Sequence, residues 1–197
     1  MNINFKTEES LELARSIAKN VKSFHTYHHI LYDIGKNFYN GQLTYVEIGC
    51  FAGASACLMV QLDNARVISV DIGKPVKKEV ALSNVAKYNR LNNFYRYIKG
   101  DSTKKETILQ VRKLVAGGID ILFIDGSHKF KDVVSDFQNY GQMVNRGGFI
   151  VFDDYDDLRY SPEVRQAVDY LKGCFFDNYE IMDRPKNEFI IRKNGNE

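Results

Sequence analysis

The stretch Val46–Ser55, VEIGCFAGAS, decides the fold. An apolar run meets an acid, Glu47, and then two glycines, Gly49 and Gly53, with small residues after them. This order predicts a buried strand that turns through glycines into a helix. Such a turn lets a ligand approach the backbone closely, and a following helix offers unpaired N–H groups.

The rest of the chain repeats this alternation of strand and helix patterns. Strands are expected at 44–49, 65–71, 93–101, 119–125 and 147–154, with helices at 54–62, 74–91, 104–118 and beyond 129. The last of these helices is expected to extend to Val144, because an apolar helical spacing runs from Val133 to that residue. Five strands that alternate with helices predict an α/β fold with a parallel sheet covered on both faces.

Two helical patterns precede the first strand and predict a helical N-terminal cap over residues 1–40, with Tyr27 on the second helix. Residues 41–197 are expected to form the core, and the whole chain, 1–197, one domain. Near the end, Ser161 and Pro162 are expected to start a helix as its N-cap and first residue. The tail predicts two strands around a tight turn that contains Pro185 and Asn187.

The composition is that of an ordinary globular protein. A net charge of +2 and 26% charged residues favour no polyanionic partner, so no nucleic acid is expected. The three cysteines are too few and too scattered for a disulfide framework or a zinc site. Cys50 and Cys57 are therefore expected to be small packing residues. A cytoplasmic location without a membrane segment is expected, because the sequence has neither a signal-peptide pattern nor a long apolar run.

Each expected strand ends in a carboxylate. Acids and glycines are common in such loops because they turn and cap well, but five in succession favour a ligand site at this edge. The strand-end acids are Glu47, Asp71, Asp101, Asp125, Asp153 and Asp154.

The glycine loop favours a ligand without phosphates. Its G-x-x-x-G spacing departs from the G-x-G-x-x-G of dinucleotide-binding dehydrogenases, and Glu47 would repel a pyrophosphate but attract an ammonium or a sulfonium. Asp71 is placed to bind ribose hydroxyls, and Asp101 with Ser102 to contact adenine. The ligand that fits is S-adenosylmethionine (SAM). The predicted cofactor contacts are Glu47, Gly49, Phe51, Gly53, Ser55, Asp71, Asp101, Ser102 and Asp125.

From about residue 40 to 195 the chain resembles a class I SAM-dependent methyltransferase. The resemblance rests on VEIGCFAGAS, ISVD, KGDS, the segment IDILFIDGSHKFKDVVSDFQNY with Phe130 and Asp136, and GGFIVFDDY. More narrowly, the chain resembles macrocin and mycinamicin sugar O-methyltransferases and cephalosporin hydroxylase-like proteins. The resemblance implies a Rossmann-like, seven-stranded, mostly parallel sheet with a C-terminal antiparallel strand pair. It also implies methyl transfer to a sugar hydroxyl.

A metal site is implied by the same resemblance. Its macrolide-sugar members bind magnesium through acids that correspond to Asp125, Asp153 and Asp154. Two vicinal hydroxyls of the acceptor would chelate this ion, which would orient the acceptor. Those members carry Glu where this chain has Asp153, and the shorter side chain would shift the ion or favour Mn²⁺ over Mg²⁺. The alternative is a plain acidic turn, because Asp156 and Asp157 follow closely.

His128 is the predicted general base, with Asp125 three residues before it as its catalytic partner. The macrolide-sugar members carry histidine at the same offset. The alternative is a histidine that caps a helix. His25, His28 and His29 are expected to cover the mouth of the site or to pack there rather than to bind metal.

Other functions stay open at this point. One is methylation of a small molecule on a non-sugar hydroxyl, and others are a hydroxylase-like or a non-catalytic member of the same fold. The identity of the acceptor, small molecule or glycan, and the formation of a homo-oligomer also stay open.

Overall fold

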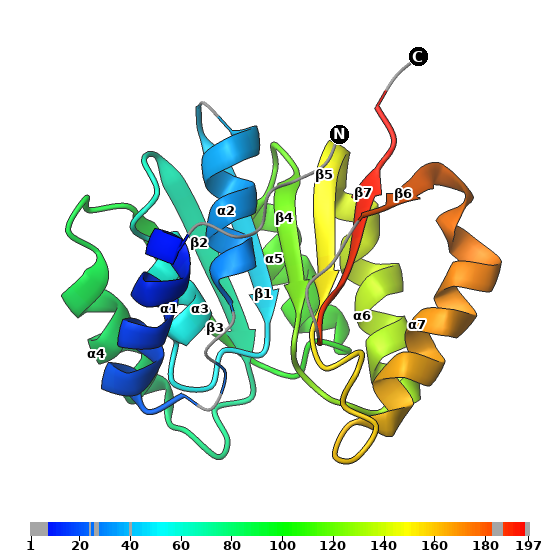
Figure 1. The fold of residues 1–197 in the computed structure, drawn as a ribbon, viewed down its shortest axis with the longest axis horizontal. Helices are drawn as coiled ribbons and strands as arrows, with labels where there is room; N and C mark the ends of the chain where they lie inside the picture. Colours follow the sequence, from blue (N-terminus) through cyan, green and yellow to red (C-terminus); the bar gives the residue numbers. More distant parts are fainter. Residues whose placement is uncertain (1–7, 24, 26–27, 40, 183–186, 196–197) are drawn as a thin grey trace.

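The computed structural model describes residues 8–23, 25, 28–39, 41–182 and 187–195. Its centre is a seven-stranded sheet in the order β3-β2-β1-β4-β5-β7-β6 (Figure 1). The first five strands are parallel, and β7 runs antiparallel to both β5 and β6. The predicted fold class is thereby confirmed. The strands are β1 (Leu43–Ile48), β2 (Ala65–Asp71), β3 (Phe94–Lys99), β4 (Ile119–Ile124), β5 (Val144–Phe152), β6 (Tyr179–Ile181) and β7 (Phe189–Lys193).

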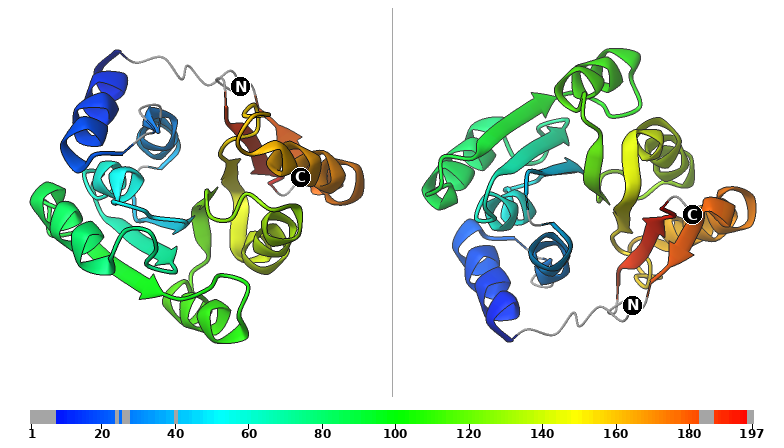
Figure 2. Two further views of the ribbon diagram at one scale, coloured as in Figure 1. Left: turned by 90° about the horizontal axis from the view of Figure 1, so that it is seen from below. Right: turned by 90° about the horizontal axis from the view of Figure 1, so that it is seen from above.

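Helices cover both faces of this sheet, as the two views in Figure 2 show. Alternate strand residues point to opposite faces, so Tyr45 joins one apolar core and Val46 the other. The first core includes residues of α1 (Glu8–Val21), α2 (His29–Phe38), α3 (Ala54–Met59) and α4 (Lys78–Tyr88). The second includes residues of α5 (Lys105–Leu114), α6 (Phe130–Tyr140) and α7 (Pro162–Phe175).

The N-terminal helices belong to the first of these layers. Ile17 of α1 and Ile34 of α2 are fully buried in the same apolar cluster as Leu58 of α3. The expected helical cap is therefore packed against the sheet-covering layer. Tyr27 and Pro185 lie outside the described residues. No helix in the described ranges is both long and apolar enough to cross a membrane.

Several element boundaries differ from the prediction by a few residues, and two of these differences have a clear physical cause. Val144 starts β5 rather than ending α6, because it pairs with Ile119 of β4 and buries its side chain from the strand. The helix α3 ends at Met59 rather than near residue 62. There the Asn93 amide donates to the carbonyls of Val60 (2.9 Å) and Leu62 (2.7 Å), which ends the helix in a turn.

Candidate functional site

The glycine loop after β1 is shaped by the end of the neighbouring strand β4. Gly49 has φ +92°, and a Cβ there would lie 1.8 Å from the carbonyl oxygen of Asp125. Only glycine fits this crossing of two strand ends. Gly53, with φ +85°, stands just before α3. The sequence predicted these glycines for ligand approach, and the structure adds a packing reason at Gly49.

Asp71, at the end of β2, holds this loop in place. Its Oδ2 accepts hydrogen bonds from the backbone N–H groups of Cys50 (2.8 Å) and Phe51 (3.0 Å). Its Oδ1 accepts one from Gly73 (2.5 Å). A carboxylate has about four acceptor positions, so Oδ1 retains one for a ligand hydroxyl.

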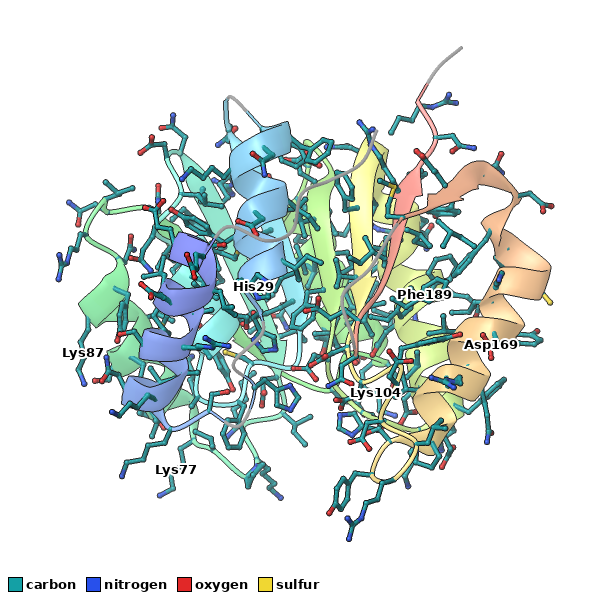
Figure 3. All side chains as sticks on the ribbon, in the orientation of Figure 1. His29, Lys77, Lys87, Lys104, Asp169 and Phe189 are labelled. Carbon is teal, nitrogen blue, oxygen red and sulfur yellow. The ribbon has the colours of Figure 1, made fainter. Side chains whose placement is uncertain are left out.

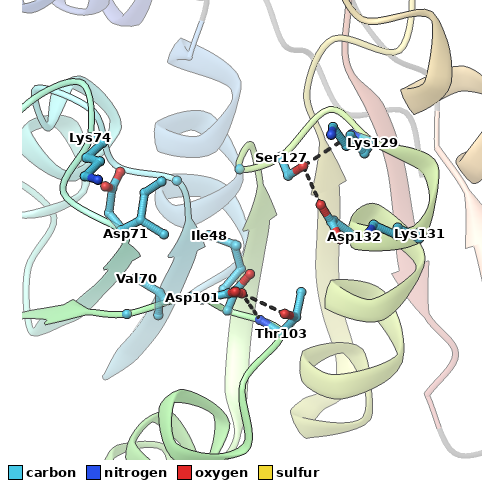
Figure 4. Close-up of a pocket in the computed structure, with 15 residues that line it drawn as sticks. Ile48, Val70, Asp71, Lys74, Asp101, Thr103, Ser127, Lys129, Lys131 and Asp132 are labelled. Carbon is cyan, nitrogen blue, oxygen red and sulfur yellow. Dashed lines mark hydrogen bonds between the residues drawn. The ribbon is translucent and has the colours of Figure 1, made fainter.

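A cavity of about 490 Å³ opens across the carboxyl ends of β1, β2, β3 and β4 (Figure 4). This volume lies in the range of small-molecule and cofactor sites. Four predicted cofactor contacts line it: Gly49, Asp71, Asp101 and Ser102. Asp101 accepts hydrogen bonds from the N–H (2.9 Å) and hydroxyl (2.7 Å) of Thr103, which lower the pKa of its carboxyl.

A second cavity, of about 270 Å³, shares Gly49, Asp71 and Gly126 with the first. Phe51, Ser55 and Asp125 line it, as do His25, His28 and His128. The two cavities thus follow the strand ends from the β3 side of the sheet toward β4.

Glu47 lies beneath the loop, outside the linings of both cavities, and Gly53 is outside them as well. The Glu47 side chain is fully buried and accepts hydrogen bonds from three hydroxyls, those of Tyr45 (2.8 Å), Ser55 (2.5 Å) and Ser69 (2.6 Å). Burial raises its pKa, and the hydroxyls of Ser55 and Ser69 oppose the rise. These contacts fix Ser55 as a bridge between the loop and the strand.

Three acids converge at the ends of β4 and β5. Asp125 follows β4, Asp153 and Asp154 follow β5, and the side chains of the last two are nearly fully buried. Burial raises the pKa of Asp125 well above its usual range, and the charges of Asp153 and Asp154 raise it further. Burial and the charge of Asp153 also raise the pKa of Asp154. Ionising all three together therefore requires positive charge nearby.

Two histidines from the N-terminal segment lie against Asp153. The Nδ1 of His25 lies 2.8 Å from Oδ2 of Asp153, and the Nε2 of His28 lies 3.5 Å from the same oxygen. Burial alone would raise the pKa of Asp153, but these two imidazoles hold it below its usual range. The hydrogen bond to Asp153 raises the pKa of His25. Within the described part of the chain, every ion pair of the three acids is with a histidine.

His128 stands on the other side of these acids. Its Nε2 lies 3.2 Å from Oδ2 of Asp154 and 4.0 Å from Oδ1 of Asp125. Its Nδ1 lies 2.9 Å from the hydroxyl of Ser161, which also donates to Asp154 (3.2 Å). Ser161 and Pro162 occupy the predicted N-cap and first-turn positions of α7, but the Ser161 side chain caps no helix N–H. The predicted cap position is therefore confirmed, while the Ser161 hydroxyl contacts His128 and Asp154 instead of a helix N–H.

Among the described residues, two groups of side chains have donor atoms close enough to hold a metal ion. Asp125, His128 and Asp154 form one, and His25, His28, Asp125 and Asp153 form the other, each with all donor atoms within 4.8 Å of one another. Carboxylate and imidazole donors fit a divalent cation. Asp125 belongs to both groups, so the predicted acids are divided between two neighbouring clusters.

Sequence reasoning missed the approach of His25 and His28 to Asp153, and the role of Ser161 beside His128. A spacing of three residues between the two histidines was the available signal, and it is weak. Their contact with Asp153 depends on how the fold brings distant parts of the chain together, which no local sequence pattern predicts. Figure 3 labels the next residue, His29, in the first turn of α2 near this edge of the sheet.

The family model for a methyltransferase domain matches residues 46–155, from the glycine loop to the residue after Asp154. The chain belongs to the methyltransferase domain family. An uncharacterized protein of Acanthamoeba polyphaga mimivirus is 40% identical over 169 residues, which cover 82% of this chain and 76% of that protein. The predicted recognition and enzyme class, a SAM-dependent methyltransferase, are confirmed at the level of family and fold.

Solved structures share the fold of this methyltransferase. The MycE methyltransferase of the mycinamycin pathway, in complex with Mg, SAH and mycinamycin VI, aligns with a TM-score of 0.68 at 18% identity, over 92% of this chain and 54% of MycE. The chain thus spans about half the length of MycE. The O-methyltransferase NovP aligns with a TM-score of 0.60 at 19% identity, over 93% of this chain and 79% of NovP. A putative caffeoyl-CoA O-methyltransferase from Staphylococcus aureus aligns with a TM-score of 0.68 at 16% identity, over 96% of this chain and 93% of that protein.

Proposed function

We propose that this methyltransferase methylates a hydroxyl of a sugar, on a glycan or a glycosylated small molecule, using SAM and a divalent metal ion. The observation that carries the proposal is the convergence of Asp125, Asp154 and His128 beside the second cavity. NovP, an O-methyltransferase that shares the fold, supports the O-methyl chemistry, and the MycE complex with Mg, SAH and mycinamycin VI supports a metal ion and a small-molecule acceptor. The sugar in the proposal follows from the resemblance to sugar O-methyltransferases.

The first cavity would hold the adenosine part of the cofactor. Oδ1 of Asp71 would accept a hydrogen bond from a ribose hydroxyl, in addition to the one from Gly73. Asp101 and Ser102 would lie beside the adenine. The methionine part would extend past Gly49 into the second cavity, toward Phe51 and Ser55. SAM, when bound, supplies the methyl group from its sulfonium and leaves as S-adenosylhomocysteine.

Asp125, Asp153 and Asp154 would hold the ion, Mg²⁺ or Mn²⁺, which when bound supplies positive charge for an oxygen that loses its proton. The feature of this chain that fits such an ion is a cluster of three acids, of which Asp153 and Asp154 are buried and Asp125 and Asp154 have raised pKa values. The vicinal hydroxyls of a sugar would then be oriented by the same acids and by His128.

His128 would take the proton from the acceptor hydroxyl. A carboxylate only accepts hydrogen bonds, so the Ser161 hydroxyl donates to Asp154 and can accept the Nδ1–H of His128. That arrangement leaves a lone pair on Nε2, which could take the proton of the acceptor hydroxyl once Asp154, 3.2 Å away, is bound to the ion. Ser161 would thus set the tautomer of the base.

The test is turnover with SAM, Mg²⁺ or Mn²⁺ and a panel of glycosides, measured as S-adenosylhomocysteine release and a mass gain on the acceptor. We expect product with a glycoside and loss of product in EDTA. Methylation confined to non-sugar hydroxyls would replace the proposed substrate class. Turnover that needs an oxidant and no methyl donor would favour the hydroxylase alternative, and no turnover with any acceptor class would favour a non-catalytic member.

The role of His128 has a separate test. His128→Ala should reduce kcat by about 10²–10⁴-fold, with little change in KM, because proton removal matters in the transition state. Added imidazole should restore part of the rate, since the His128 side chain is 43% exposed and its place is open to solvent. Near-normal turnover in this variant would assign proton removal to another group.

A further inference from the structure

We propose that His25 and His28 are metal ligands, and that together with Asp125 and Asp153 they form a mixed nitrogen–oxygen centre that prefers a transition-metal ion to Mg²⁺. The inference deepens the proposed function, because it rests on a metal ion at this edge of the sheet. It adds ligands that the chain supplies from its N-terminal segment, outside the strand ends on which the predicted site was based.

The distances suit direct ligation. Donor atoms around an ion at about 2.1 Å lie about 3.0–3.4 Å apart when adjacent and about 4.2 Å apart when opposite. His25 Nδ1 and His28 Nε2 lie 2.8 Å and 3.5 Å from Oδ2 of Asp153. All four donor atoms lie within 4.8 Å of one another, so small side-chain movements would place them around one ion.

The surroundings hold one of these rings in place. The His28 ring is buried and meets Phe123 of β4 edge-on, with 5.2 Å between the ring centroids. The His25 and His28 rings are 5.5 Å apart and also meet edge-on. Fixed ring orientation is what a metal centre requires of its imidazoles, because ligands that are already oriented lose less entropy on binding.

The donor types decide the kind of ion. Mg²⁺ prefers oxygen ligands and keeps several waters, whereas imidazole suits Fe²⁺, Ni²⁺, Cu²⁺ and Zn²⁺. Mn²⁺ also favours oxygen ligands, but it accepts imidazole more readily than Mg²⁺ does. Two imidazoles and two carboxylates in one cluster therefore favour the transition metals. His128 and Asp154 lie in the neighbouring cluster, which shares Asp125 with this one. His128 would remain for the acceptor, and Asp154 would approach the ion from the side of Asp125.

The experiment is calorimetric titration of the metal-free protein with Mn²⁺ and with Mg²⁺. Its variants are His25→Gln and His28→Gln, with His29→Gln as the matched control, because His29 is the next histidine and lies outside both clusters. We expect the wild type to bind Mn²⁺ at least tenfold more tightly than Mg²⁺. Each of the first two variants should lose about tenfold or more in Mn²⁺ affinity, and the control should keep it.

Pulsed EPR of the Mn²⁺ complex identifies the nitrogen ligands directly. Imidazole nitrogen coupling should persist in His128→Gln and disappear in the His25→Gln/His28→Gln double variant. The reverse pattern, or unchanged Mn²⁺ affinity in both single variants, would overturn the inference. If His28→Gln does not fold, His25→Gln carries the test, since the His25 side chain is 29% exposed.

The outcomes separate this inference from the proposed function. A wild type that binds Mg²⁺ and Mn²⁺ equally, with both histidine variants unaffected, rejects the histidine ligands and leaves the metal-dependent methyltransferase standing. A wild type that binds neither ion rejects both. In that case His25 and His28 serve only as ion-pair partners of Asp153.

Discussion

The two halves of the sheet's carboxyl edge use the same residue type in opposite ways. On the β2 and β3 side, Asp71 and Asp101 accept hydrogen bonds from backbone N–H groups of the loops around them. On the β4 and β5 side, Asp125, Asp153 and Asp154 face one another and three histidines. The first half is a set of loops shaped by hydrogen bonds to acids, and the second is a cluster of acids and histidines.

The pKa values of the acids also differ between the two halves. Hydrogen bonds from Thr103 lower the pKa of Asp101, so this acid is ionised without help. Burial and neighbouring acids raise the pKa of Asp125, so its ionised form is unfavourable until a cation arrives. Local hydrogen bonds favour the ionised form of Asp101, whereas the ionised forms of Asp125 and Asp154 would be stabilised by a nearby positive charge.

The largest effect is expected in the second half. Asp154→Ala should reduce methyl transfer by about 10³-fold or more, because an ion that stabilises a developing alkoxide contributes several kcal/mol. S-adenosylhomocysteine affinity should stay close to that of the wild type, since Asp154 lines neither cavity. Product formation and calorimetry measure the two quantities separately. Full activity of the wild type in EDTA would reject a catalytic metal ion. The acids after β4 and β5 would then shape loops, as Asp71 and Asp101 do.

A smaller effect, of the opposite kind, is expected in the first half. Asp71→Ala should weaken S-adenosylhomocysteine binding by about 10–100-fold, because a charge-assisted hydrogen bond to ribose and the support of the loop are both lost. Asp71→Asn keeps an acceptor oxygen for the loop, so it should lose less affinity. Metal affinity should change in neither variant. Unchanged cofactor affinity by calorimetry in Asp71→Ala would place Asp71 outside the cofactor site.

Much of this arrangement follows from local sequence patterns. The five parallel strands and their terminal acids were predictable because apolar runs of strand length alternate with helical periodicity. The division of the acids was not, since it depends on which atoms of distant loops meet them. Backbone N–H groups reach Asp71, whereas His25 reaches Asp153 from 128 positions away. The Ser161 hydroxyl illustrates the same limit, because its cap position is local and its bond to Asp154 is tertiary.

The smallest effect on activity is expected at Asp136, an acid that belongs to neither half. It lies on α6 with 1% of its surface exposed, and burial raises its pKa to about 7. An unfolded aspartate has a pKa of about 3.9, so the folded protein binds more protons between about pH 4 and pH 7. The free energy of unfolding should therefore fall as the pH rises through that window and level off above it.

Asp136→Asn removes this ionisation while it keeps the size of the side chain. The variant should gain stability over the wild type from about pH 4 upward, by no more than about 4 kcal/mol at pH 8, and change methyl transfer little. Urea unfolding of both proteins at pH 5 and pH 8, followed by circular dichroism, measures the difference. The subtraction isolates Asp136, because His25 and the clustered acids titrate alike in both proteins. A stability difference that is the same at both pH values would mean that Asp136 is ionised throughout this range. Asp136 would then resemble Asp101, whose ionised form is stabilised by hydrogen bonds.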